Sequence, residues 1–274
     1  MKRSSGIRLC VTVAVSALSL ALITGCSDGG SDKAESNTKG TTGDSAQDSS
    51  KNTAKALTVA ELKKLALAKG DATGYEIGSV GKTFPASKSA VTADKAQCRP
   101  LAWAMAAQAP GEAGAATNKL VTEAKKPSSA ASKSMEDMTE KEFDDAFGTA
   151  LDRTTTVVGL SSYDGDGAEK AFKSVSDGVR SCSGGFTVTS GGDSQKYTEV
   201  AAEKASDTGD ESVAFGASAV MEDSGGKTGT THTEVVRHGN TLVTYYTVNL
   251  GALMSGKAYV VPPAVIDAQA AKLK

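Results

Sequence analysis

The chain has 274 residues, of which 39% are hydrophobic, and it carries 30 Lys and Arg against 32 Asp and Glu. This balance suits a globular domain, and it lacks the clustered basic residues that a nucleic-acid surface requires. We therefore expect no nucleic-acid partner, and no polybasic contact with a membrane.

The first 25 residues have the three parts of an export leader in the right order. A basic start leads into an apolar stretch from Leu9 to Ile23, and the small residues Thr24 and Gly25 precede Cys26. The pattern resembles the leader of bacterial lipoproteins, which is cut just before a cysteine that carries diacylglycerol. The resemblance implies a signal peptide over residues 1–25 and a lipid on Cys26. The alternatives are an ordinary secretory signal and an uncleaved anchor, although about 15 apolar residues fall short of the roughly 20 that span a bilayer.

A lipid on Cys26 decides the expected location of the rest of the chain. Cleavage would leave 27 basic and 32 acidic side chains. Each buried methylene of an acyl chain adds about 0.8 kcal/mol, so two chains anchor a protein stably. No later segment has the length and apolar character of a membrane span. We expect a lipid-anchored protein on the extracellular face of the cytoplasmic membrane, within the cell envelope.

Two of the four cysteines remain once the leader and the lipid are accounted for. Cys10 belongs to the leader and Cys26 is the lipid site, which leaves Cys98 and Cys182. Two thiols in an exported domain most simply form one disulfide. The bond would close a loop of about 84 residues, worth roughly 4–5 kcal/mol in the chain-entropy model. The alternative is a pair of free buried thiols.

Residues 26–56 are predicted to be a disordered tether. From Ser27 to Ala56 the chain has no aromatic residue and no Val, Ile, Leu or Met, so it cannot bury enough apolar surface to become ordered. A flexible chain of this length has an r.m.s. span of roughly 30 Å. Such a tether would hold a domain away from the membrane.

Ordered structure is predicted to begin at Leu57. Thr58 and Glu61 have the spacing of a capping box, and a leucine stripe follows until Gly70. Residues 74–80 alternate like a short strand.

Between residues 100 and 142 the sequence predicts helices separated by a long segment without regular structure. A helix is expected from Pro100, because proline is tolerated at the first helical position. Residues 109–134 are rich in Ala, Gly, Ser and Lys and are predicted to be a long, mobile excursion. Thr139 and Glu142 make a second capping box.

From residue 153 onward the sequence patterns of strands and helices are clearer. Residues 153–163 are β-branched and predict a strand, and residues 168–182 form a helical stripe that places Cys182 on the buried face. Gly239-Asn240 is a two-residue hairpin signal, and Pro262 opens a final helix. Further strands are expected at 186–190 with 195–203, then 212–222, 230–238 and 241–250.

This order of elements predicts one α+β domain over residues 57–274. The consecutive C-terminal strands with short turns favour a mostly antiparallel sheet, with helices packed on one side of it. One disulfide would tie the domain together.

The chain resembles a known family in several short motifs that span most of residues 57–274. The matching segments are 57–62, the early Cys98 ahead of a helix, 168–172, 179–182, 186–188 and 237–243. The resemblance is to the extracellular sensor-like domains of actinobacterial cell-envelope proteins, the PknH-like sensor domain family. These occur as free lipoproteins and as the outer part of a membrane serine/threonine kinase. The resemblance implies a cleft that faces a ligand, and it offers no catalytic residues.

Two groups of side chains could suggest a metal site. His232 and His238 on one strand would lie some 20 Å apart, too far to share an ion; we interpret them as surface strand residues. Asp164, Asp166 and Glu169 lack the later ligands of a calcium loop, and turn and helix-start chemistry explains them better. We predict no catalytic, cofactor-binding or metal-binding residues.

Three aromatic residues are candidates for a ligand cleft. Trp103 with Tyr245 and Tyr246 could line a pocket for an apolar or sugar ligand, and the alternative for each is core packing.

The predicted function is non-enzymatic sensing or binding by a surface-tethered lipoprotein. The ligand could be a small molecule, cell-wall material or a protein. A carrier or chaperone of lipid-like molecules is the main alternative, and it requires a large apolar cavity. A hydrolase with an unrecognised site is the second.

Overall fold

The computed structural model describes residues 54–82, 84–124, 138–221 and 226–274. The chain divides into two units, Met1–Asp48 and Ser49–Lys274, and all of the described residues belong to the second. The predicted leader, the lipid site at Cys26 and nearly all of the tether lie outside the described residues, so these remain predictions.

Helices and strands are interspersed along the described residues. The helices are α1 (Val59–Leu65), α2 (Arg99–Met105), α3 (Glu140–Leu151), α4 (Gly167–Ser181), α5 (Leu250–Ser255) and α6 (Pro263–Ala271), with 3₁₀ turns η1 (Lys88–Ala90) and η2 (Ala96–Cys98). The strands are β1 (Tyr75–Gly78), β2 (Val91–Ala93), β3 (Ala115–Glu123), β4 (Thr155–Ser162), β5 (Phe186–Ser190), β6 (Asp193–Tyr197), β7 (Glu199–Glu203), β8 (Glu211–Val220), β9 (Thr228–His238) and β10 (Thr241–Val248).

The strands form two antiparallel sheets. The larger has seven strands in the order β1-β3-β4-β10-β9-β8-β7, and the smaller has three in the order β2-β5-β6. β9 and β10 pair with Thr241 opposite His238, so Gly239-Asn240 forms the predicted hairpin turn. The prediction of an α+β domain with a mostly antiparallel sheet is confirmed.

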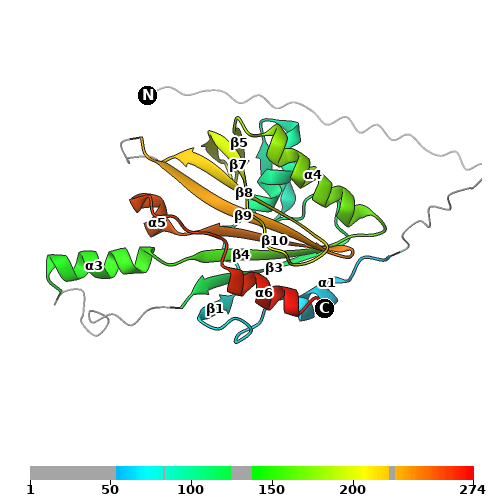
Figure 1. Cartoon of the computed structure of the whole chain (residues 1–274), viewed down its shortest axis with the longest axis horizontal. Coiled ribbons are helices and arrows are strands. Elements are labelled where there is room, and N and C mark those ends of the chain that lie inside the picture. Colours follow the sequence, from blue (N-terminus) through cyan, green and yellow to red (C-terminus); the bar gives the residue numbers. More distant parts are fainter. Residues whose placement is uncertain (1–53, 83, 125–137, 222–225) are drawn as a thin grey trace, which may run out of the picture. The chain divides into compact units, whose positions relative to one another are not determined.

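Helices cover both faces of the large sheet, where the sequence predicted only one covered side. Val235 and Leu242 belong to a core closed by α2 and α4, whereas their neighbours Val236 and Val243 belong to a second core closed by α1 and α6. Figure 1 shows α4 on one side of the sheet and α1 with α6 on the other. The central strands are apolar at consecutive positions, which is the pattern of a strand buried on both faces.

The predicted helix signals are borne out at α1 and α4. At α1, the Thr58 hydroxyl accepts a hydrogen bond from the Glu61 N–H at 3.3 Å, and the Glu61 carboxylate accepts one from the Thr58 N–H at 2.7 Å. The apolar stripe of α4 is buried against the sheet, and it comprises Ala168, Ala171, Phe172, Val175 and Val179.

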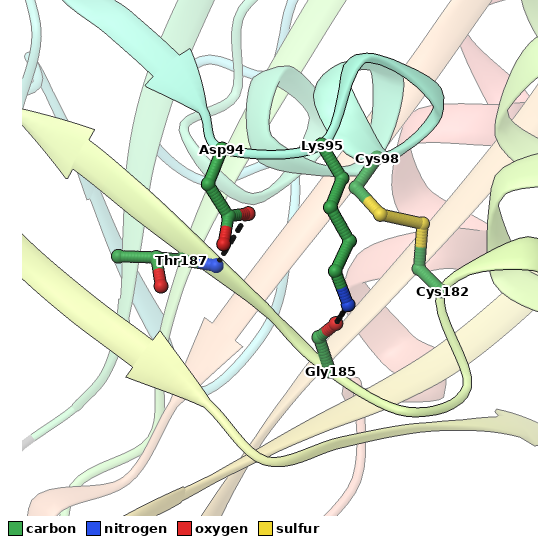
Figure 2. The surroundings of a disulfide bond; sticks show 6 residues. All are labelled: Asp94, Lys95, Cys98, Cys182, Gly185 and Thr187. Carbon is green, nitrogen blue, oxygen red and sulfur yellow. Dashed lines mark hydrogen bonds between the residues drawn. A yellow bond between two sulfur atoms is a disulfide. The ribbon is translucent and has the colours of Figure 1, made fainter.

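The disulfide between Cys98 and Cys182 joins the start of α2 to the end of α4, as predicted. Figure 2 shows two further links beside it. Lys95 Nζ donates to the Gly185 carbonyl at 2.6 Å, and the Thr187 N–H donates to Asp94 Oδ1 at 2.9 Å. Together these contacts hold β5, and with it the small sheet, against the segment that leads into α2.

Two strand predictions were wrong. The stretch predicted as a mobile excursion contains β3, which pairs with β1 on one side and β4 on the other. Its Ala- and Lys-containing sequence has weak strand propensity, and its apolar partner β4 supplies the context that overrides it. The single strand predicted at 195–203 is two strands, β6 and β7, which separate at Thr198 and join different sheets.

Candidate functional site

A pocket of about 600 Å³ lies between the large sheet and the small sheet. It is on the face that α2 covers, and its walls come from α2, both sheets and the ends of α3 and α5. Most of its lining is apolar and includes Val91, Ala102, Met105, Leu151, Val188 and Leu250. The volume is typical of small-molecule sites, which span roughly 300–1,000 Å³.

Small residues on α2 and at its C-cap create the space. Ala102 and the C-cap residue Ala106 line the pocket where longer side chains would fill it, and Met105 lies beside them. Val188 of β5 and Tyr246 of β10 also line the pocket. Protein interiors are normally close-packed, so a gap of this size between two sheets is a distinct feature of the domain.

Two tyrosines give the pocket an amphipathic wall. The hydroxyls of Tyr197 and Tyr246 lie near each other and near the Thr231 hydroxyl. Burial raises the pKa of both phenols, so both are neutral at physiological pH. The Tyr246 ring packs edge-on against Phe84, with 6.3 Å between the centroids. The rings therefore offer apolar surface together with hydroxyl groups.

A polar edge of the pocket is built around Arg153, between α3 and β4. Its Nε and Nη2 donate to the Glu123 carbonyl at 2.9 and 2.6 Å, and Nη2 is 3.4 Å from the Glu76 carboxylate. Thr122 of β3 and Thr155 of β4 are opposite each other in the register and also line the pocket. This edge combines a guanidinium with two hydroxyls.

Of the three aromatic residues predicted to form a cleft, Tyr246 lines this pocket. Tyr245 is fully buried in the core of the opposite face, because successive strand residues point to opposite faces of a sheet. Trp103 packs beside the pocket without lining it: its Nε1 donates to the Val91 carbonyl at 3.3 Å, and Lys88 Nζ lies 3.9 Å from the ring centroid.

Exposed apolar side chains continue outward from the rim of the pocket. A groove of about 550 Å³ between α3 and α5 is lined by Phe147, Leu151 and Met254, and Leu151 borders both the groove and the pocket. Phe147, Leu250 and Met254 are each more than half exposed. Figure 1 shows α3 and α5 at the same end of the sheet.

Neither histidine lines the pocket, and His232 is not the surface strand residue that the sequence predicted. His232 Nδ1 lies 2.9 Å from both carboxylate oxygens of Glu203, and the ring packs edge-on against Tyr259. Glu203 on β7 reaches His232 on β9 across Gly216, where a Cβ would lie 2.5 Å from Glu203 Oε1. His238 is partly buried, and burial lowers its pKa.

The acidic loop before α4 serves the local structure. Asp164 accepts a hydrogen bond from the Ala56 N–H at 2.8 Å, and Asp166 pairs with Lys170 at 2.8 Å. Across the described part of the chain, no three His, Cys, Asp or Glu side chains converge as a metal site would require. In the same residues, no helix has the length and apolar character to span a membrane.

Comparison with known proteins gives a likeness in structure alone. No family model matches the chain, and no curated protein matches it. A solved structure of the extracellular domain of PknH from Mycobacterium tuberculosis is similar over 80% of this chain and 95% of its own, with 13% identity and a TM-score of 0.45. At that level the likeness assigns no function, so we argue function from the residues of this chain.

Proposed function

We propose that this domain binds a small molecule with a large apolar surface in the pocket between its two sheets. The observation that carries the proposal is the lining itself: apolar side chains from elements far apart in the sequence line a pocket of about 600 Å³. A few residues with polar groups also line it, among them Arg153, Gln195, Tyr197 and Tyr246. Ligand sites typically combine a mostly apolar wall with a few such groups.

The proposed setting is the outer face of the cytoplasmic membrane. The leader pattern supports a signal peptide over residues 1–25 and a lipid on Cys26. The Cys98–Cys182 disulfide is consistent with an oxidising compartment outside the cell. Residues between Cys26 and the domain would act as the tether.

A carrier of lipid-like molecules is the second candidate. The exposed Phe147, Leu250 and Met254 favour it, because they extend the apolar surface from the pocket to the outside. A sensor would instead hold its ligand while a partner protein reads the change. Both functions require the same pocket, and they differ in whether the ligand is released to an acceptor.

Extraction of the purified protein tests the proposal without assuming a ligand. Residues 27–274 would be secreted from a bacterial expression host and purified. The protein would be extracted with organic solvent, and the masses of the extracted compounds would be measured by mass spectrometry. We expect an apolar compound in a stoichiometric amount. An extract free of any such compound, from protein that also binds no apolar probe, would contradict the proposal.

A pocket-filling variant provides the matched comparison. Val188→Trp would place an indole in the pocket, whereas Val220→Trp adds the same side chain at an exposed valine outside it. We expect the first variant to lose the extracted compound and the second to keep it. Melting temperatures close to that of the parent chain would show that both variants are folded.

A further inference from the structure

We infer that the ligand is an anionic amphiphile whose acidic group binds Arg153, between the hydroxyls of Thr122 and Thr155. This inference rests on the proposed function, and it adds the chemical class of the ligand. It starts from the one cationic side chain among the residues that line the pocket within the described chain.

The Arg153 side chain is already ordered before an acidic group binds. Its Nε and Nη2 both donate to the Glu123 carbonyl, which fixes the plane of the guanidinium. The edge formed by Nη1 and Nη2 is left for a ligand once Glu76 is displaced, and such an edge matches a carboxylate or a phosphate in two parallel hydrogen bonds. Because the side chain is already ordered, little entropy is lost when a ligand binds.

The two threonines complete the recognition. Thr122 and Thr155 lie opposite each other in the β3–β4 pair, and both line the pocket together with Arg153. Among the described residues, no hydrogen bond is formed by either hydroxyl, so both are available as donors to an acceptor oxygen.

The acidic residues nearby do not cancel this preference. Glu76 approaches Arg153 at 3.4 Å, but its side chain is 64% exposed while that of Arg153 is 21% exposed. A solvated pair of this kind is weak, and a ligand anion can replace it. Asp193 also borders the pocket but is exposed on the small sheet, so its charge is better screened than that of Arg153.

Three amphiphiles with the same ten-carbon chain test the charge of the ligand. Decanoate, decanol and decylamine, each below its micelle concentration, would be titrated calorimetrically into residues 27–274. We expect decanoate to bind about tenfold more tightly than the other two, the ratio that one charge-assisted contact contributes. High salt should reduce this preference.

Variants separate the acidic-group site from the pocket. Arg153→Met should abolish the preference for decanoate and leave decanol binding within about twofold of the parent. Arg180→Met, at an exposed arginine on α4, is the matched control and should change nothing. The double variant Thr122→Val/Thr155→Val keeps Arg153 and should lower the preference partway, which covers the case in which Arg153→Met fails to fold.

Equal binding of the three amphiphiles, or a preference for decanoate that survives Arg153→Met, would contradict the inference that the ligand is anionic. The proposal that a ligand binds in the pocket would still be tested separately by Val188→Trp. If none of the three binds, the inference fails, and the extraction experiment alone decides the proposed function.

Discussion

Glu234 shows at the residue scale how a buried charge opposes folding. It is buried on β9, where Oε1 accepts hydrogen bonds from the Ser206 N–H at 2.9 Å and from the Ser206 hydroxyl. Burial raises its pKa above the ordinary value of 4.5, and the hydrogen bonds offset only part of that rise. The folded state therefore holds this proton to higher pH than the unfolded state does, and stability falls as the pH rises through that window.

Glu234→Gln should remove this pH dependence, because Gln keeps an acceptor oxygen for Ser206 and carries no charge. We expect the variant to be more stable than the parent at pH 7, and the difference to disappear below about pH 4, where Glu234 is protonated in both states. Urea unfolding of the parent and the variant, at pH 7 and at a pH below about 4, measures this difference in stability. Glu169→Gln, at an exposed glutamate on α4, is the control. A difference that is the same at both pH values would rule out this account.

Gly185 is required by the docking of the small sheet. Its φ is +75°, and a Cβ would lie 2.2 Å from the Tyr197 carbonyl oxygen. Gly185→Ala should destabilise the domain by more than about 2 kcal/mol, since a backbone clash adds to the left-handed conformation. Gly191→Ala is the control, because Gly191 has a φ of +63° but no atom within 4 Å of its Cβ position. Thermal melting that ranks the two variants equally would contradict the clash.

At the scale of elements, the sequence predicted those whose signal is local. The Thr58 and Glu61 spacing predicted the start of α1, and the apolar period of residues 168–182 predicted α4. β3 was missed, because its order comes from pairing with β4 rather than from its own residues. The break at Thr198 was missed for a related reason: local strand propensity does not tell which sheet a strand joins.

The disulfide should stabilise the contact between α2 and α4. Replacement of both cysteines by alanine opens a loop with a sequence separation of 84 residues. From the chain-entropy model we expect a loss of roughly 4–5 kcal/mol in the free energy of unfolding. Calorimetric melting of the double variant measures it. A melting temperature equal to that of the parent would show that Lys95 and Asp94 are enough to hold the small sheet.

At the scale of the whole molecule, the N-terminal boundary of the domain is testable. Residues 54–56 have the composition of the tether, yet each forms a hydrogen bond of 2.8 Å to a loop of the domain, with Gly165, Asn240 and Asp164 as the respective partners. A chain that starts at Leu57 should be less stable than one that starts at Ala54 by roughly 1–3 kcal/mol, the sum of three exposed hydrogen bonds. Removal of residues 27–53 should cost nothing. Equal urea midpoints for all three chains would place the boundary at Leu57.

The pocket could not be predicted from the sequence, since it exists only after the two sheets pack together. Its lining runs from Phe84 to Leu250 and follows no local motif. Of the candidate residues, Tyr246 was named because tyrosine suits a ligand wall, but Tyr245 was named with it, and only the strand register separates them. Arg153 and Met105 gave no signal of their own.

Methionine-methyl NMR tests the binding pocket most directly. The chain has six methionines, and Met105 lines the pocket while Met221 does not. With methyl-labelled residues 27–274 and increasing decanoate or decanol, we predict a saturable shift of the Met105 signal, an unchanged Met221 signal, and no Met105 shift in Val188→Trp. A Met105 signal that stays in place while either compound binds would contradict the pocket as the ligand site.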